Sequence, residues 1–476
     1  MEITSHQFKK TASLKLRDQK VQSALGKAKG KFVVARERAV KELDNLEEIR
    51  QAAADMRSHC LENLDSYLEE WEKNATAKGT VVHWAESAEE LNSLVVEIAK
   101  RNNVKKIIKS KSMIGEETGL NRFVEGHGIE VKETDLGEYI IQQAGEHPSH
   151  IIAPATHKSK DDIADLFAEK HQTPRLDDIE ALTREAREIL RPHFLTADMG
   201  ITGANFMIAE TGSTVIVTNE GNGRMTTTMP RVHVAISSIE KCIPTLDDFA
   251  LINRLLPRSA TGQSISNYVS MTTGPKREGD RDGPEEFHVI ILDVGRTRVL
   301  GSDLRDALRC IRCGACMNHC PVYQNIGGHS YGWVYPGPIG SVLTPAYKGI
   351  ENALDLPNAA TFCNQCGVVC PVKIPLPDLM RKLREKQFTR NLRPFAERLG
   401  LKVWATLAMQ PFVYSILTRT LARIGKLIGG KKRYLRKFYL VGSEWTKQRD
   451  MAAPQGRTFR EIYGERQNLS KKEDVR

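Results

Sequence analysis

The sequence lacks an apolar run long enough to cross a membrane. Its most apolar window, residues 403–417, is interrupted by Gln410 and Pro411, whereas a membrane-spanning helix needs roughly 20 apolar residues. The first residues, MEITSHQFKK, contain neither the apolar core nor the cleavage site of an export signal. We therefore expect a cytoplasmic protein without a transmembrane span.

The usual nucleotide and nucleic-acid signatures are also missing. Neither a Walker A motif nor a G-x-G-x-x-G fingerprint follows a predicted strand. No recognised nucleic-acid-binding motif accompanies the net charge of +10. We predict no nucleotide site and no nucleic-acid partner.

Cysteine is scarce outside two short runs, which hold seven of the nine cysteines. The first run has the spacing C-x2-C-x2-C-x3-C, the second has C-x2-C-x3-C, and a proline follows each. In a cytoplasmic protein such cysteines are metal ligands and not disulfides. Zinc also suits C-x2-C pairs, but the repeated C-x3-C-P ending favours iron–sulfur clusters. Cys60, which lies in a helical stretch, is expected to be a packed free cysteine.

In the bacterial two-cluster pattern, the fourth cysteine of each run binds the cluster of the other run. This rule predicts a [4Fe-4S] cluster bound by Cys310, Cys313, Cys316 and Cys370. It leaves three ligands for a second cluster, namely Cys320, Cys363 and Cys366. Ala360 stands where the eighth cysteine is expected. The second site is a [3Fe-4S] centre, a [4Fe-4S] centre with water or a non-cysteine residue as its last ligand, or a cluster completed by a partner.

Four regions are expected in the 476 residues: a helical segment over 1–77, an α/β domain over 78–297, a helical ferredoxin-like domain over 298–385 and a basic helical extension over 386–476. Apolar residues recur at helical spacing in the first region. In the second, short β-rich runs alternate with helices, as in a largely parallel sheet. The predicted strands are 81–84, 106–108, 129–132, 151–153, 215–218, 232–236 and 289–292, and two of the predicted helices are 88–99 and 161–169.

A glycine-rich stretch, residues 199–225, stands out within the α/β region. Its five glycines imply tight turns and close backbone approach, and turns at strand ends are where ligands bind in open α/β sheets. Backbone amides there would hold an anion, with Glu210 or Glu220 as acid, base or nucleophile. The alternative is a structural hairpin whose turn residues have no further role.

The basic charge is concentrated in the C-terminal extension. From residue 374 onward there are 24 Lys and Arg against nine Asp and Glu. Because the apolar window at 403–417 is followed by basic residues, this segment either contacts an anionic membrane surface or docks an acidic partner.

With these motifs in view, nearly the whole chain resembles the lactate utilisation protein B family. The resemblance rests on PSHIIAPATHKSK at 148–160, GITGANFMIAETGSTVIVTNEGNGR at 200–224, CIRCGACMNHCPVY at 310–323 and CNQCGVVCPVKIP at 363–375. It implies an α/β domain like that of sugar-phosphate isomerases and CoA transferases, and a helical two-cluster ferredoxin domain. The family pattern implies the same cysteine assignment.

The resemblance further implies work with two sister proteins that oxidises L-lactate to pyruvate. We expect an electron-transfer subunit, without catalysis of its own, that passes electrons toward an acceptor such as the quinone pool. Two alternatives remain open. The α/β domain is itself the catalytic, substrate-binding unit, or the protein is a non-redox assembly scaffold.

Overall fold

The fold is described here from a computed structural model of the chain. It describes residues 2–435, 446 and 449–473. The predicted C-terminal extension thus lies in part, at 436–445, 447–448 and 474–476, outside the described residues. The chain forms two compact units, Met1–Thr389 and Arg390–Arg476, so the first three predicted regions share one unit.

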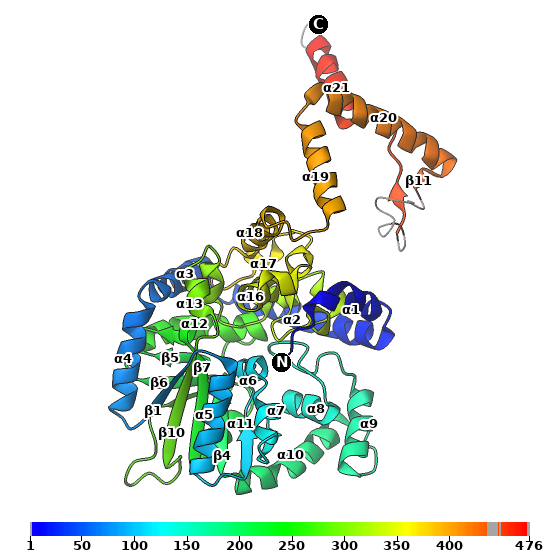
Figure 1. Ribbon diagram of the computed structural model, residues 1–476. Helices are drawn as coiled ribbons and strands as arrows, with labels where there is room; N and C mark the ends of the chain where they lie inside the picture. Colours follow the sequence, from blue (N-terminus) through cyan, green and yellow to red (C-terminus); the bar gives the residue numbers. More distant parts are fainter. Residues whose placement is uncertain (1, 436–445, 447–448, 474–476) are drawn as a thin grey trace. The chain divides into compact units, whose positions relative to one another are not determined.

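A six-stranded sheet forms the centre of the first unit (Figure 1). The strand order is β1-β10-β7-β4-β2-β3 and every neighbouring pair is parallel. The strands are β1 (Val81–Ala85), β2 (Lys106–Lys109), β3 (Glu130–Glu133), β4 (Met199–Gly203), β7 (Val232–Ser238) and β10 (Glu286–Leu292). β7 is buried at all seven positions, as expected when both faces of a parallel sheet are covered. The predicted parallel α/β fold is confirmed.

Helices cover both faces of this sheet. Side chains alternate along a strand, so Ile107 packs into one apolar cluster and Ile108 into another. The first cluster includes residues of α5 (Ala88–Arg101), α6 (Met113–Thr118) and α7 (Leu120–Glu125). The second includes residues of α8 (Leu136–Ala144), α9 (Lys160–His171) and α10 (Ile179–Thr196). Ser87 caps α5 by accepting a hydrogen bond from the amide of Glu90.

A second, four-stranded sheet was not predicted. Its order is β8-β5-β6-β9, with β5 (Phe206–Ile208), β6 (Ser213–Thr218), β8 (Cys242–Ile243) and β9 (Tyr268–Thr272). β5 and β6 form an antiparallel hairpin. Gly212 in its turn has φ +65°, and a Cβ there would lie 2.3 Å from the backbone nitrogen of Ala75, so this turn requires glycine. The remaining helices of the α/β region are α11 (Asn222–Thr228), α12 (Leu246–Ala260) and α13 (Arg296–Leu300).

The predicted strand at 151–153 is wrong, because this segment is an irregular loop. The imidazole Nδ1 of His150 accepts hydrogen bonds from the amides of Ile152 (3.0 Å) and Ala153 (3.1 Å). A side chain therefore satisfies the backbone donors that a strand would pair with a neighbour. The other six predicted strands overlap strands of the structure.

The two cysteine runs lie among helices. Two of these, α14 (Ala315–Asn318) and α17 (Gln365–Val368), each contain one cysteine of a run. The others are α15 (Tyr323–Ile326), α16 (Gly337–Lys348) and α18 (Leu376–Thr389). The predicted N-terminal helical segment is present as α1 (Phe8–Lys15), α2 (Gln19–Lys41), α3 (Leu46–Glu62) and α4 (Leu64–Thr76). Cys60 on α3 is buried and its thiol donates to the carbonyl of Cys242 at 3.0 Å. It is packed, as predicted.

The second unit contains α19 (Phe395–Ala408), α20 (Pro411–Gly429), β11 (Tyr434–Leu435), β12 (Met451–Ala452) and α21 (Phe459–Glu473). The small residues Ala422, Gly425 and Gly429 form the buried side of α20. Apolar residues at helical spacing are exposed on it, including Phe412, Ile416, Leu421, Ile424, Leu427 and Ile428. Of the helices that the structure describes, none is both long and apolar enough to cross a membrane.

Candidate iron–sulfur site and adjoining cavity

Four of the seven clustered cysteines line one small cavity. They are the four assigned to the first cluster, namely Cys310, Cys313, Cys316 and Cys370. Cys370 lies 54 positions beyond Cys316 in the sequence, yet the fold brings it to the other three. The structure describes all seven of these cysteines, and none of them forms a disulfide.

The two runs share a backbone pattern as well as a spacing. In the first run, Arg312 (φ +59°) and Gly314 (φ +74°) flank Cys313. In the second, Phe362 (φ +55°) and Asn364 (φ +63°) flank Cys363. Left-handed conformations at matching positions turn both loops in the same way. By this correspondence, Ala360 occupies the place that Cys310 has in the first run.

The chemistry of the first group fits an iron–sulfur cluster. The amides of Arg312 and Ile374 donate to the sulfurs of Cys310 and Cys370, each at 3.4 Å, as backbone amides do around cluster sulfurs. Burial raises the pKa of Cys370 to about 11, and the neighbouring amide of Ile374 opposes this shift. Metal ligands must be deprotonated, so these thiols need a strongly positive partner in order to ionise.

Arginines of the N-terminal helices hold the second run in place. Arg50 on α3 donates to the carbonyls of Val368 and Cys370, each at 2.7 Å. Arg36 on α2 donates to the carbonyl of Val369 at 3.0 Å. Neither residue was predicted from the sequence, in which each is simply a charge on the buried side of an amphipathic helix.

The remaining three cysteines form a second group whose charges interact. Burial, followed by the charges of Cys320 and Cys363, raises the pKa of Cys366 to about 12. Cys363 is exposed, and the backbone amide of Gln365 lowers its pKa. The pKa of Cys316 in the first group is raised by burial and also by Cys366. The helices α14 and α17, which contain Cys316 and Cys366, also contact each other. The two groups are therefore adjacent, and the exposed Cys363 opens the second toward solvent.

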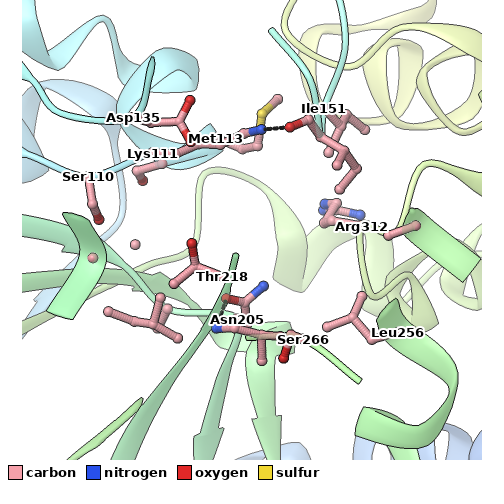
Figure 2. A pocket seen from close by; sticks show the side chains of 18 of the residues that line it. Ser110, Lys111, Met113, Asp135, Ile151, Asn205, Thr218, Leu256, Ser266 and Arg312 are labelled. Atoms are coloured by element: carbon pink, nitrogen blue, oxygen red, sulfur yellow. Dashed lines mark hydrogen bonds between the residues drawn. The ribbon is translucent and has the colours of Figure 1, made fainter. Parts of the chain in front are cut away.

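A larger cavity of about 360 Å³ lies at the carboxyl ends of the parallel strands (Figure 2). Its lining includes residues that follow β2 and residues at the ends of β4 and β7, such as Ser110, Gly203 and Ser238. The chain passes from β2 to β3 in one direction and from β4 to β7 in the other. The cavity thus lies at the topological switch point, where open α/β sheets bind ligands.

The glycine-rich stretch contributes both a hairpin and part of this cavity. Residues 206–218 form the β5–β6 hairpin, while residues 203–205, 216–220 and 222–223 line the cavity. The stretch therefore forms a hairpin and also lines a cavity, while the binding of an anion there stays a prediction.

The structure separates the two glutamates that the sequence singled out. Glu220 lines the cavity, where burial and the nearby carboxylate of Asp135 raise its pKa to about 7, although the residue as a whole reaches solvent. Glu210 does not line it. Its carboxylate instead accepts a hydrogen bond at 3.0 Å from the amide of Leu246 at the start of α12.

Buried charges that were not predicted from the sequence connect this cavity with the first cysteine run. Glu240 pairs with Arg296 at 2.9 Å and with Arg312 at 3.1 Å. Arg296 also pairs with Glu117 at 2.8 Å. Burial disfavours ionisation, but Arg296 and Arg312 hold the pKa of Glu240 at about 2. Because the residues of this network lie far apart in the sequence, no local motif predicts it.

Together, the parallel α/β domain and the paired cysteine groups define an iron–sulfur protein with a ferredoxin-like module. Three family descriptions match the chain: the LUD domain at 68–292, a 4Fe-4S dicluster domain at 306–374, and lactate utilisation protein B, C-terminal, at 380–468. The chain belongs to the lactate utilisation protein B family.

Three curated relatives support this placement. Lactate utilization protein B of Bacillus licheniformis is 42% identical and that of Bacillus subtilis 41% identical, each with 98% of both chains covered. A protein of Escherichia coli called uncharacterized electron transport protein YkgF is 40% identical, again with 98% of both chains covered.

Proposed function

We propose that this protein is the iron–sulfur electron-transfer subunit of a multi-protein system that oxidises L-lactate to pyruvate. The observation that carries the proposal is the adjacency of two cysteine groups within one module. The names of the relatives, which refer to lactate utilization and electron transport, support it. Oxidation of lactate to pyruvate releases two electrons and two protons, and bound iron–sulfur clusters transfer electrons singly.

In this proposal each cysteine group holds one cluster. Cys310, Cys313, Cys316 and Cys370 hold a [4Fe-4S] cluster, in keeping with the cavity that they line. Cys320, Cys363 and Cys366 hold a second cluster of the [4Fe-4S] or [3Fe-4S] type. The amides of Arg312 and Ile374 orient the first group, and Arg50 fixes the loop that carries Cys370.

The exposed side of the second group is the proposed point of electron exchange with another protein. Cys363 and Val368 are exposed there, and Ala360 leaves the site one cysteine short. The two sister proteins of the lactate system are the proposed partners. The proposed final acceptor is the quinone pool.

The second unit supports a location at the cytoplasmic membrane surface. α20 exposes a stripe of apolar residues, and the basic residues Arg419, Arg423, Lys426 and Lys431 to Arg433 accompany it. An amphipathic helix of this kind binds an anionic bilayer through its apolar face, with its cations near the headgroups. The proposed occupant of the stripe is therefore an anionic lipid surface.

Iron and sulfide quantitation with EPR on the anaerobically purified protein tests the cofactor part of this proposal. We expect iron and acid-labile sulfide for two clusters, and signals from both after reduction with dithionite. Zinc in place of iron, or iron for a single cluster, would overturn it.

A further inference from the structure

Two residues are shared between the α/β cavity and the cavity of the first cysteine group. Ile151 and Arg312 line both. Ile151 belongs to the loop whose His150 is bonded to Asn318 at 2.9 Å. Arg312 lies within the first cysteine run itself. A molecule in the α/β cavity is therefore separated from the first cluster position by little more than these side chains.

Arg312 has an unused donor in this wall. Its side chain is only 7% exposed, and its Nη2 donates to Glu240 at 3.1 Å. Its guanidinium also lies over the ring of Tyr335, at 4.8 Å from the centroid. Its Nη1, by contrast, is buried and has no hydrogen-bond partner. Buried charged donors without a partner are uncommon, and Figure 2 shows this guanidinium pointing into the cavity.

The rest of the lining suits a small anion that also carries a polar oxygen. Lys241 lines the cavity together with Arg312. Asp135 and Glu220 also line it, and Figure 2 shows Asp135 on the far side from Arg312. Glu240, which pairs with Arg312, and Lys111, which donates to the carbonyl of Ile152, also line the cavity. The free donor of Arg312 attracts a carboxylate, whereas Asp135 and Glu220 disfavour a highly charged anion and can accept a hydrogen bond from a hydroxyl group.

We propose that the α/β cavity binds a hydroxy- or oxo-carboxylate, whose carboxylate pairs with the free Nη1 of Arg312 beside the first cluster position. The inference rests on the proposed function only in the choice of lactate and pyruvate as probes. Binding itself requires no electron transfer. The cavity volume of about 360 Å³ falls at the lower end of the range for drug-sized ligands, roughly 300–1,000 Å³. It exceeds the need of a three-carbon acid, so acids with longer side chains are expected to bind as well.

Equilibrium binding to the anaerobic, cluster-containing full-length protein tests this site without turnover. L-lactate, pyruvate, 2-oxohexanoate and inorganic phosphate are titrated in separate arms. We expect saturable binding of the carboxylates, with 2-oxohexanoate at least as tight as pyruvate, and no competition by phosphate. Arg312→Gln should weaken carboxylate binding at least tenfold. Arg298→Gln, which changes an arginine that lines neither cavity, should leave it unchanged.

A second variant, Asn205→Asp, separates loss of carboxylate binding from loss of the cluster, because it changes a residue outside the cysteine runs. Asn205 lines the cavity, and its Oδ1 accepts a hydrogen bond from the amide of Val217 at 2.9 Å. Asn205→Asp keeps this acceptor and adds a negative charge, so it should also weaken binding at least tenfold while iron content stays normal. Full-strength binding in Asn205→Asp, phosphate binding in place of carboxylate, or no carboxylate binding by the unaltered protein would each overturn the proposal. The electron-transfer role could survive all three results.

Discussion

Cys320 connects the two cysteine runs. It belongs to the first run by sequence, yet its charge interacts with Cys363 of the second run. Burial raises the pKa of its thiol, so its ionisation depends on a metal partner. In the proposed assignment Cys320 binds only the second cluster. Its replacement therefore distinguishes an electron relay from a scaffold, because the proposed ligands of the first cluster stay intact.

For Cys320→Ser we expect loss of the EPR signal of the second cluster and of lactate-driven electron transfer. The signal of the first cluster and the thermal unfolding midpoint should change little. Cys60→Ser is the matched control, since the hydroxyl can still donate to the carbonyl of Cys242 and both signals should remain. If stability and both signals fall together in Cys320→Ser, the clusters serve as scaffold and the relay is wrong.

At this scale the sequence was informative where ligands follow a local spacing. The spacing of the cysteines predicted that Cys370 joins Cys310, Cys313 and Cys316, and these four line one cavity. The glycine-rich turns drew attention to Glu220, which lines the other cavity. Arg312, Glu240 and Lys241 were not predicted, because their surroundings depend on contacts between residues far apart in the sequence, such as Arg312 and Glu240, which are 72 positions apart. Glu210 looked equivalent to Glu220 in the sequence, yet it lies at the other end of the β5–β6 hairpin.

At the scale of elements, β4 and α11 pack closely against each other, and both contribute residues to the lining of the cavity. A Cβ at Gly200 would lie 1.9 Å from the carbonyl oxygen of Thr226. The sequence predicted tight packing at such glycines, but it did not show which backbone approaches. It also did not reveal the four-stranded sheet, since β5 and β8 are too short to give a period.

Gly200→Ala should therefore lower the free energy of unfolding by about 3 kcal/mol, because the backbone of α11 must move away. Gly26→Ala is the matched control on α2, where a Cβ meets nothing within 4 Å. It should raise the free energy of unfolding by about 0.5–1 kcal/mol, since alanine is the better helix former. Urea denaturation of the three proteins measures both shifts. Equal stability of Gly200→Ala and the unaltered protein would contradict the packing.

α20 gives a second prediction at this scale. The protein should sediment with vesicles that contain phosphatidylglycerol and not with vesicles of phosphatidylcholine alone, and added salt should weaken the binding. Ile428→Asp should reduce binding more than tenfold, because burying one such side chain contributes about 1.5–3 kcal/mol. Ile265→Asp in the first unit is the control, since Ile265 is 75% exposed and Ile428 is 71% exposed. If both variants bind the anionic vesicles equally well, the apolar stripe of α20 does not contact the lipid surface and the proposal is wrong.

At the scale of the whole molecule, the first unit contains both a cavity of a size that binds small ligands and the two cysteine groups. Helices from the N-terminal segment support the cluster loops through Arg36 and Arg50, although the sequence suggested a separate region there. The predicted boundaries at 77, 297 and 385 follow changes in composition, and the packing crosses the first two of them.

The most direct test of the account is EPR on the protein mixed with its two sister proteins and L-lactate under anaerobic conditions. We predict that lactate reduces the clusters in the complete mixture, with pyruvate formed at one molecule per two electrons. Omitting either sister protein should leave the clusters oxidised. Clusters that remain oxidised in the complete mixture while pyruvate accumulates would contradict the electron-transfer role.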